Sequence, residues 1–112
     1  QMDLSKISFS KKYDGIWASF SFQHLEKNEQ NLLFRKVSSA LNKSGVFYVG
    51  IHEGNKIYRD NLHRLYVPRT EIDLRKIFRK NNFKIFNFFK EKNLSFDNKP
   101  INVMHIFGKL KI

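Results

Sequence analysis

The stretch that decides the fold reads Tyr13-Asp14-Gly15-Ile16-Trp17-Ala18-Ser19-Phe20-Ser21-Phe22-Gln23-His24-Leu25. Its first part predicts an apolar strand over 16–18, and the polar and aromatic residues behind it predict a bend. A helix should begin near Asn28, and a second apolar strand over 46–51 follows Gly45. A strand, a bend, a helix, a glycine turn and a strand make one βαβ crossover, the unit from which parallel sheets are built. Ligand sites of such sheets lie at the carboxyl ends of the strands.

The first helix is predicted to run from about Asn28 to Leu41, with Asn28 as its N-cap. Apolar residues at helical spacing predict one face that packs on the sheet: Leu33, Val37, Ala40 and Leu41. Gly45 is expected to adopt the left-handed conformation that commonly ends a helix. The strand over 46–51 is nearly all apolar, which is typical of a parallel strand covered on both faces.

The segment 52–68 is irregular and polar, and a loop of this length in a small domain is usually functional. Thr70 is the predicted N-cap of a second helix, with Asp73 three positions later. We expect Asn81-Asn82 to end this helix and its buried side to hold Ile72, Leu74, Ile77 and Phe78. Two final strands over 83–89 and 101–110 are predicted to form an antiparallel pair.

Composition limits the classes of function. A chain of 112 residues is one domain or a piece of one. The absence of Cys excludes disulfides and thiolate metal sites and fits a reducing compartment, so we expect a cytoplasmic protein. No apolar run reaches the roughly 18 residues that span a bilayer, and we expect no membrane partner. The four His (24, 52, 63 and 105) lack metal-ligand spacing, and no metal site is predicted.

The formal net charge of +11 is high for this length. A basic surface attracts polyanions, which leaves RNA open as a partner. Lys, Phe, Asn and Ile are all abundant, however, and we favour a biased composition with a solvated basic face as the explanation of the charge. Exposed phenylalanines beside lysines can stack on nucleobases. We nevertheless expect the aromatic residues of the segment 83–89 to pack against the second helix.

The order of the elements is the end of a strand, a βαβ unit, a long loop, a helix and an antiparallel pair. This order of elements, together with the sequences of the segments 13–25, 41–54 and 64–83, resembles the C-terminal half of a class I S-adenosylmethionine-dependent methyltransferase of the type 11/12-like group. The resemblance implies an α/β, Rossmann-like half-sheet with strands equivalent to strands 4, 5, 7 and 6 of that fold. It also implies an antiparallel last pair and two main helices. We expect 1–112 to be a single domain of this kind.

The resemblance also implies a cofactor site. In that family, S-adenosylmethionine lies across the switch point between the first and fourth strands. The positions that match its contacts are Asp3, Leu4, Ala18, Ser19 and Phe20. Asp3 matches an acid that accepts a hydrogen bond from the adenine amino group, which a carboxylate is suited to do. Residues 18–20 match the strand end that holds the methionine part of the cofactor.

A substrate pocket is implied by the same comparison. His24 matches a histidine that often lines the floor of that pocket, where it could act as a general base or simply cap the approach to the helix. Glu53, Tyr58 and Arg64 are expected to lie over the same crevice, and Arg64 is the best candidate to bind a carboxylate or phosphate. No catalytic residue is predicted, because methyl transfer from a sulfonium depends mainly on the alignment of donor and acceptor. The acceptor is not identified.

One departure from the family concerns its acidic-x-Gly-x-Gly loop, which this sequence does not contain. Without the strands that accompany the loop, the strand ending at Ala18 becomes an apolar edge that favours pairing with another chain. We expect the missing half from upstream residues, from a second polypeptide or from a second copy in a homodimer. Three functions remain open: methyl transfer to a small molecule, which we favour, methyl transfer to RNA, and a noncatalytic interaction module.

Overall fold

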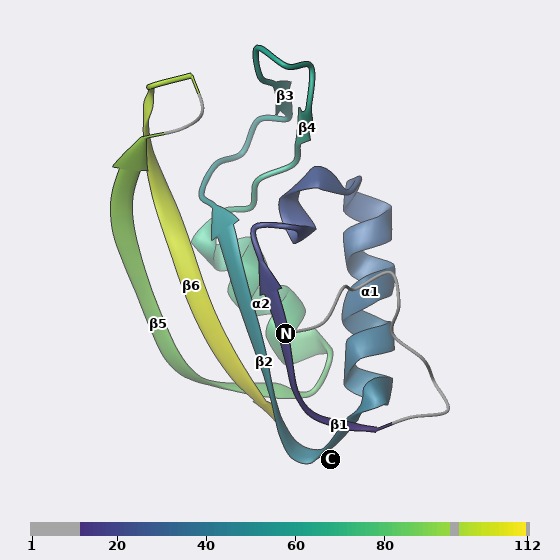
Figure 1. Cartoon of the computed structure of the whole chain (residues 1–112). Coiled ribbons are helices and arrows are strands. Elements are labelled where there is room, and N and C mark those ends of the chain that lie inside the picture. Colours follow the sequence, from purple (N-terminus) through teal and green to yellow (C-terminus); the bar gives the residue numbers. More distant parts are fainter. Residues whose placement is uncertain (1–11, 95–96, 112) are drawn as a thin grey trace.

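A computed structural model describes residues 12–94 and 97–111 (Figure 1). The elements, in chain order, are β1 (Tyr13–Ser19), the short 3-10 helix η2 (Phe22–His24), α1 (Lys27–Ala40), β2 (Leu41–His52), β3 (Tyr58–Arg59), β4 (Leu65–Tyr66), α2 (Glu71–Lys80), β5 (Phe83–Leu94) and β6 (Pro100–Leu110). The four long strands form one sheet, and β3 and β4 form a separate two-stranded sheet. In the described ranges, no helix combines the length and apolar character needed to cross a membrane.

The order of strands in the main sheet is β1-β2-β6-β5. β1 runs parallel to β2, with Ser19 opposite Gly50, while β6 is antiparallel to both β2 and β5. This topology confirms the predicted α/β half-sheet with a parallel crossover and an antiparallel last pair. β1 and β5 are the edges of the described sheet. The carboxyl ends of β1 and β2 therefore lie side by side, with η2, β3 and β4 at the same end of the molecule (Figure 1).

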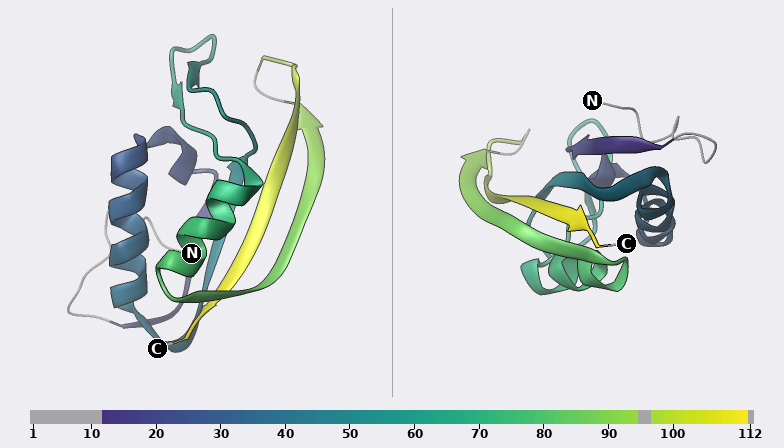
Figure 2. Two further views of the ribbon diagram at one scale, coloured as in Figure 1. Left: turned by 180° about the vertical axis from the view of Figure 1, so that it is seen from behind. Right: turned by 90° about the horizontal axis from the view of Figure 1, so that it is seen from below.

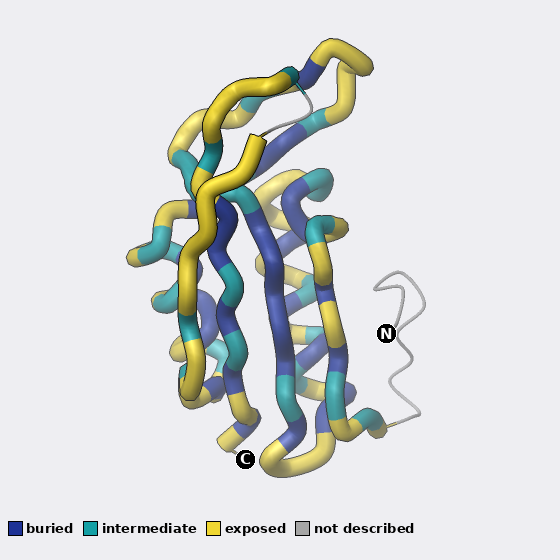
Figure 3. Tube along the Cα trace, turned by 60° about the vertical axis from the view of Figure 1, so that its left-hand side comes forward, coloured by how far each residue is buried: buried dark blue, intermediate teal, exposed yellow. Residues whose placement is uncertain are grey.

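Both long helices cover the same face of the sheet, as Figure 2 shows from behind and from below. Alternate residues of the strands meet the helices in one core, in which four phenylalanines from different elements are fully buried: Phe34, Phe47, Phe78 and Phe83. Figure 3 shows how buried and exposed positions alternate along the strands. On the other face of the sheet, Trp17 keeps 40% of its surface exposed. No described helix covers this face, which we call the bare face.

The prediction for the first helix is confirmed in type and differs by one residue at each end, but its N-cap is wrong. α1 begins at Lys27, and its N-cap is Glu26, whose side chain makes no capping hydrogen bond. The predicted cap, Asn28, lies inside the first turn. The buried Gln30 side chain instead donates to the carbonyls of Phe22 and Leu25, so long-range hydrogen bonds fix the start of this helix.

The face that α1 buries is also shifted from the prediction. It consists of Gln30, Phe34, Val37 and Ala40, while Leu41 is already the first residue of β2. Gly45 was predicted to be left-handed, but the residue with positive φ is Ser44, at 67°. A Cβ on Gly45 would lie 2.8 Å from the carbonyl oxygen of Asn42. Close backbone approach, and not a left-handed turn, explains this glycine.

The second helix agrees with the prediction except at one residue. The Thr70 hydroxyl accepts a hydrogen bond from the Asp73 amide at 3.2 Å, which confirms the N-cap, and Asn81 follows the last helical residue. Leu74, Ile77 and Phe78 are buried, whereas Ile72 is 80% exposed. Residues two apart point to different sides of a helix, so Ile72 cannot share the face of Leu74.

The aromatic segment of β5 divides between the two faces of the sheet. Phe83 is buried and Phe88 packs against the core, as expected from the prediction, but Phe86 and Phe89 are 53% and 46% exposed. The pairing with β6 changes register between Ile85 and Asn87. Strand alternation together with this irregularity places two of the four phenylalanines on the bare face.

Candidate functional site

The first part of the candidate site is the end of β1. Ser19 is exposed and lies opposite Gly50, and the Phe20 amide donates to the Gly50 carbonyl at 2.9 Å. Phe20 has a φ of 60°, a left-handed conformation that is unfavourable for a bulky side chain. Such conformations persist only where the surroundings enforce them, and they cluster at functional sites.

The predicted cofactor residues occupy different environments. The Ala18 side chain is fully buried in the core, so only its backbone can face a ligand at the strand end. Phe20 is partly buried, and its ring lies 6.1 Å from the ring of His52 and 6.2 Å from that of His105, centroid to centroid. Asp3 and Leu4 lie outside the described residues.

A stack of rings stands next to the end of β2. The Tyr66 ring lies 4.8 Å from that of Tyr58, nearly parallel to it, and 5.5 Å from that of His52, while His24 meets its edge at 4.7 Å. Nδ1 of His52 also lies 3.4 Å from the Tyr58 hydroxyl. We call these four residues the aromatic cluster. The structure therefore brings together two predicted substrate residues, His24 and Tyr58, and does so through His52 and Tyr66.

His24 is held in one orientation. Its Nδ1 lies 2.7 Å from the Leu65 carbonyl oxygen, which can only accept, so Nδ1 carries a proton and donates it. In the neutral ring, Nε2 is then the unprotonated nitrogen and is able to accept a proton or a hydrogen bond. This is the arrangement that a general base requires.

The Glu53 side chain binds residues outside the aromatic cluster. Its carboxylate is bound by Lys90 at 2.6 Å and by the Asn102 amide at 3.0 Å, and Lys90 also contacts Glu71 at 3.1 Å. The Lys90 hydrogen bond lowers the pKa of Glu53, so the group is ionised at neutral pH. These contacts connect the end of β2 to β5 and β6.

Arg64 was predicted to bind an anionic ligand, but its guanidinium binds Asp60 of the same loop. Nε and Nη2 of Arg64 each lie 2.7 Å from Oδ2 of Asp60. Asp60 is buried and also accepts from the Leu62 and Arg64 amides and from the Tyr66 hydroxyl. Burial alone would raise the pKa of Asp60, but these hydrogen bonds outweigh it and hold the pKa at about 2. The pair fixes the conformation of the β3–β4 loop beneath the aromatic cluster.

A hydrogen-bonded chain crosses the bare face of the sheet close to Phe20. The Tyr48 hydroxyl lies 2.7 Å from Nδ1 of His105, and Nε2 of His105 lies 2.7 Å from Glu91. Burial raises the pKa of Tyr48, so its hydroxyl is protonated at neutral pH. A Cβ on Gly50 would lie 2.5 Å from that hydroxyl, which explains a glycine at this position in the strand.

Sequence reasoning missed His52, Tyr66, Tyr48 and His105. His52 lies two residues beyond Gly50 on the same strand, and His105 pairs with Gly50 from β6, so a strand-alternation argument could have placed both on one face. No local signal places Tyr66, because its position depends on the fold of the β3–β4 loop. Among the residues the structure describes, no group of three or more His, Asp or Glu is arranged to hold a metal.

With this geometry established, comparison with known proteins identifies the fold. No protein-family model matches the chain, and no curated protein sequence matches it. Solved structures do match. A methyltransferase from Methanosarcina mazei, described as SAM-dependent, superposes with a TM-score of 0.81 at 13% identity, over 99% of this chain and 66% of that one.

Two further structures carry substrate names. The 1,6-didemethyltoxoflavin-N1-methyltransferase of Burkholderia thailandensis, solved with its substrate and S-adenosylhomocysteine, gives a TM-score of 0.76 at 15% identity, covering 99% of this chain and 49% of that one. The magnesium protoporphyrin IX methyltransferase of Synechocystis, solved with bound SAM, gives 0.67 at 15% identity, covering 98% and 44%. The chain thus spans about half to two thirds of the length of these proteins.

The fold is therefore the Rossmann-like fold of class I SAM-dependent methyltransferases. Within that fold the chain is the C-terminal half, in which the predicted strands 4, 5, 7 and 6 are β1, β2, β6 and β5.

The aromatic cluster predicts a pH dependence of stability. Burial, and to a lesser degree the nearby His24, lowers the pKa of His52. The unfolded chain therefore binds a proton at His52 more readily than the folded chain does, and stability rises with pH in this range. We expect the full contribution above about pH 6.5, the ordinary pKa of His, and its loss as the pH falls through the lower folded value.

Urea unfolding at pH 7.5 and 5.5 measures this effect. The variant His52→Gln should show a smaller difference between the two pH values than the parent protein, and the exposed His63→Gln should leave the difference unchanged. An equal difference in all three proteins would show that His52 is not the group responsible.

Proposed function

We propose that this chain supplies part of the cofactor and substrate site of an S-adenosylmethionine-dependent methyltransferase that acts on a small molecule. The observation that carries the proposal is the pair of parallel strands β1 and β2, whose adjacent carboxyl ends hold Ser19, Phe20 and the aromatic cluster. In parallel α/β sheets this end is where ligands bind. The fold shared with SAM-dependent enzymes supports the choice of cofactor.

The residues present fit one side of that cofactor. Bound S-adenosylmethionine would supply a methyl group activated on a sulfonium. Ser19 presents an exposed side chain at the strand end, and the Phe20 ring beside it provides an apolar wall next to His52. Aromatic faces attract cations, and an apolar wall also excludes water from the reacting groups. Asp3 and Leu4 remain proposed contacts to the adenine.

We propose that the acceptor lies against the aromatic cluster. Tyr58 and His24 would contact it, with the unprotonated Nε2 of His24 available to take the proton that an amine or hydroxyl acceptor loses on methylation. Glu53 and Arg64 would act indirectly, because their charged groups are bound to Lys90 and Asp60 and hold the surrounding segments in place. A flat, aromatic acceptor fits the stacked rings best.

The outer edge of β1 implies a partner. Within residues 12–94 and 97–111, no strand pairs with this edge. An apolar edge strand invites pairing, and the larger size of the matching structures supports a further set of strands there. We propose that the rest of the fold, whether on the same polypeptide, on a second chain or from a second copy, pairs with β1 and completes the cofactor site. The cytoplasm is the compartment that we propose for the protein.

A second candidate function is methyl transfer to RNA. The net charge of +11 favours it, since such a surface attracts polyanions. A noncatalytic interaction module is the third candidate, and it becomes the leading one if the completed protein does not bind the cofactor.

Equilibrium dialysis of radiolabelled S-adenosylmethionine against the protein with both halves of its fold tests the proposal. We expect saturable binding, and Ser19→Lys should weaken it at least tenfold, because a long cation would stand beside the sulfonium. The control Asn42→Lys adds the same charge at an exposed site near the other end of the sheet and should bind as the parent does. Equal affinity in both variants, or no binding in the parent protein, would refute the site.

A further inference from the structure

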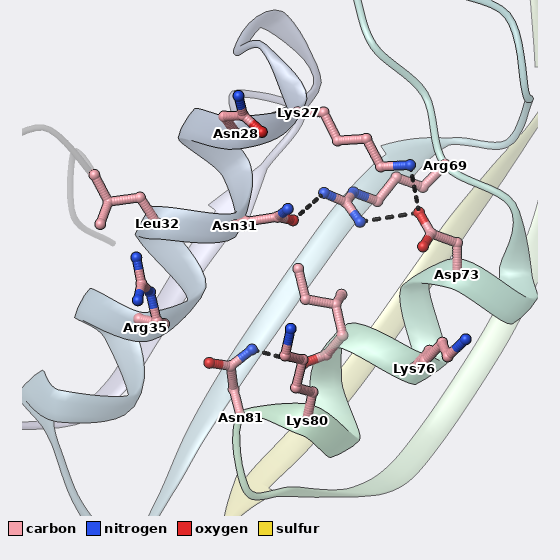
Figure 4. A pocket seen from close by; sticks show the side chains of 11 residues that line it. Lys27, Asn28, Asn31, Leu32, Arg35, Arg69, Asp73, Lys76, Lys80 and Asn81 are labelled. Atoms are coloured by element: carbon pink, nitrogen blue, oxygen red, sulfur yellow. Dashed lines mark hydrogen bonds and ion pairs between the residues drawn. The ribbon is translucent and has the colours of Figure 1, made fainter.

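A groove between α1 and α2 encloses a volume of about 660 Å³ among the described residues. Figure 4 shows side chains from both helices converging on it, together with Arg69 from the segment that precedes α2. Its volume falls within the range of ligand sites in proteins. The groove lies on the helix-covered side of the sheet, and no step proposed above uses it.

Cationic side chains line both walls. Lys27 and Arg35 lie eight residues apart on α1, about 12 Å along its axis and about 80° apart around it, and both line the groove. Lys76 and Lys80 lie one turn apart on α2, at about 6 Å. Within the described ranges, no ion pair joins Arg35, Lys76 or Lys80 to an acidic group. Within these ranges their positive charge is therefore not neutralised by an ion pair.

The floor of the groove contains the positive charge of Arg69, which hydrogen bonds hold in place. The Arg69 side chain is 2% exposed, and its guanidinium is held by Gln30 at 2.6 Å, Asn31 at 2.7 Å and Asp73 at 2.9 Å. Asp73 is the one acidic residue that lines the groove, and it is bound by Arg69 and, at 3.9 Å, by Lys27. A concave surface with one sign of charge concentrates the electrostatic field, and the groove as a whole is positive.

We propose that this groove binds the phosphodiester backbone of single-stranded RNA. Cations on both walls, spaced by about 12 Å along α1 and about 6 Å along α2, can contact phosphates of a strand that carries one negative charge per nucleotide. Arg35 favours phosphate as the anion, because a guanidinium group binds phosphate oxygens through paired N–H donors. No aromatic side chain lines the groove, so the contacts position the strand without stacking on or reading its bases.

The position of the groove makes RNA binding compatible with the proposed cofactor site. The helices that form the groove, α1 and α2, both lie on one face of the sheet (Figure 2), and no described helix covers the opposite face. This inference extends the second candidate function above, but it requires neither the cofactor nor methyl transfer. Binding in the groove is expected to be independent of sequence and strongly dependent on salt.

Fluorescence anisotropy with a labelled 12-nucleotide oligouridine, without cofactor, tests the inference. If four cations contact phosphates, the logarithm of the binding constant should fall against that of the salt concentration with a slope of about −3. Lys76→Gln with Lys80→Gln should reduce the affinity about tenfold at 100 mM salt and make the slope less steep by about 1.4. Lys76→Arg with Lys80→Arg should restore parent affinity.

The matched control is Lys84→Gln with Lys109→Gln. These exposed lysines are paired across β5 and β6 away from the groove, and their double variant has the same net charge as the test variant. It should bind as the parent does, and dialysis with labelled cofactor should give the same affinity in both double variants. Equal losses of RNA affinity would assign binding to the overall charge and overturn the inference. Displacement of the oligouridine by poly-glutamate as efficiently as by unlabelled RNA would also overturn it.

Discussion

Replacement of Phe34 by Ala should lower the free energy of unfolding by about 3–5 kcal/mol, the range for removal of a buried aromatic side chain. Phe34 is fully buried in α1, and its ring meets those of Phe22, Phe47 and Phe78 edge to face, with centroids 5.1, 5.3 and 5.1 Å away. These contacts join η2, β2 and α2 to α1. The variant loses buried apolar area, three aromatic pairs and the packing that holds the helices on the sheet.

Urea denaturation followed by circular dichroism measures the loss. Phe86→Ala is the matched control, because it removes the same side chain from a position that is 53% exposed, and its effect should stay near 0.5 kcal/mol. A loss below about 1 kcal/mol for Phe34→Ala would mean that the core closes around the cavity, contrary to the close packing of protein interiors. The proposed cofactor site is untouched by either substitution.

The fold was predictable because its strongest signals are local. The run of apolar residues in 46–51, the crossover between the first two strands and the Thr70 cap each depend on neighbours in sequence, and each is confirmed. Phe34 was missed although it belongs to the same helical face, because the predicted stripe was set by Leu33, which is only partly buried. Leu33 and Phe34 lie about 100° apart around the helix, and Val37 and Ala40 can share a face with either of them, so only the partner sheet decides which of the two is buried.

The position of the candidate site in the fold was predictable from the sequence, but the arrangement of its side chains was not. Parallel strands bring their carboxyl ends together, so residues 18–20 and 52 had to be close in any such crossover. The stack of Tyr58, Tyr66 and His52 and the pairing of Arg64 with Asp60 depend on the path of the β3–β4 loop. Loop conformation arises from contacts between residues distant in sequence, and a linear pattern does not contain that information.

Gln30 shows most clearly how a polar residue can determine structure without a sequence signal. Gln30 is fully buried on α1, and its side-chain amide donates to the carbonyls of Phe22, Leu25 and Val67 at 3.0–3.1 Å. Its Oε1 accepts from Nε of Arg69 at 2.6 Å. One side chain thus joins η2, α1 and the segment before α2, and its most distant partner in sequence, Arg69, lies 39 residues away.

Gln30→Ala should therefore lower the free energy of unfolding by about 3–5 kcal/mol, because an unsatisfied buried polar group costs about 1–3 kcal/mol and several are created together. Among them is the buried guanidinium of Arg69, whose pKa burial already lowers. Asn31→Ala is the comparison: Asn31 is exposed and contributes one hydrogen bond to the same guanidinium, so its loss should cost about 1 kcal/mol. Gln30→Met, which keeps the length of the side chain and removes its polar atoms, separates packing from hydrogen bonding. If Gln30→Met is as stable as the parent in urea, the hydrogen bonds contribute nothing net and the start of α1 must be held by packing alone.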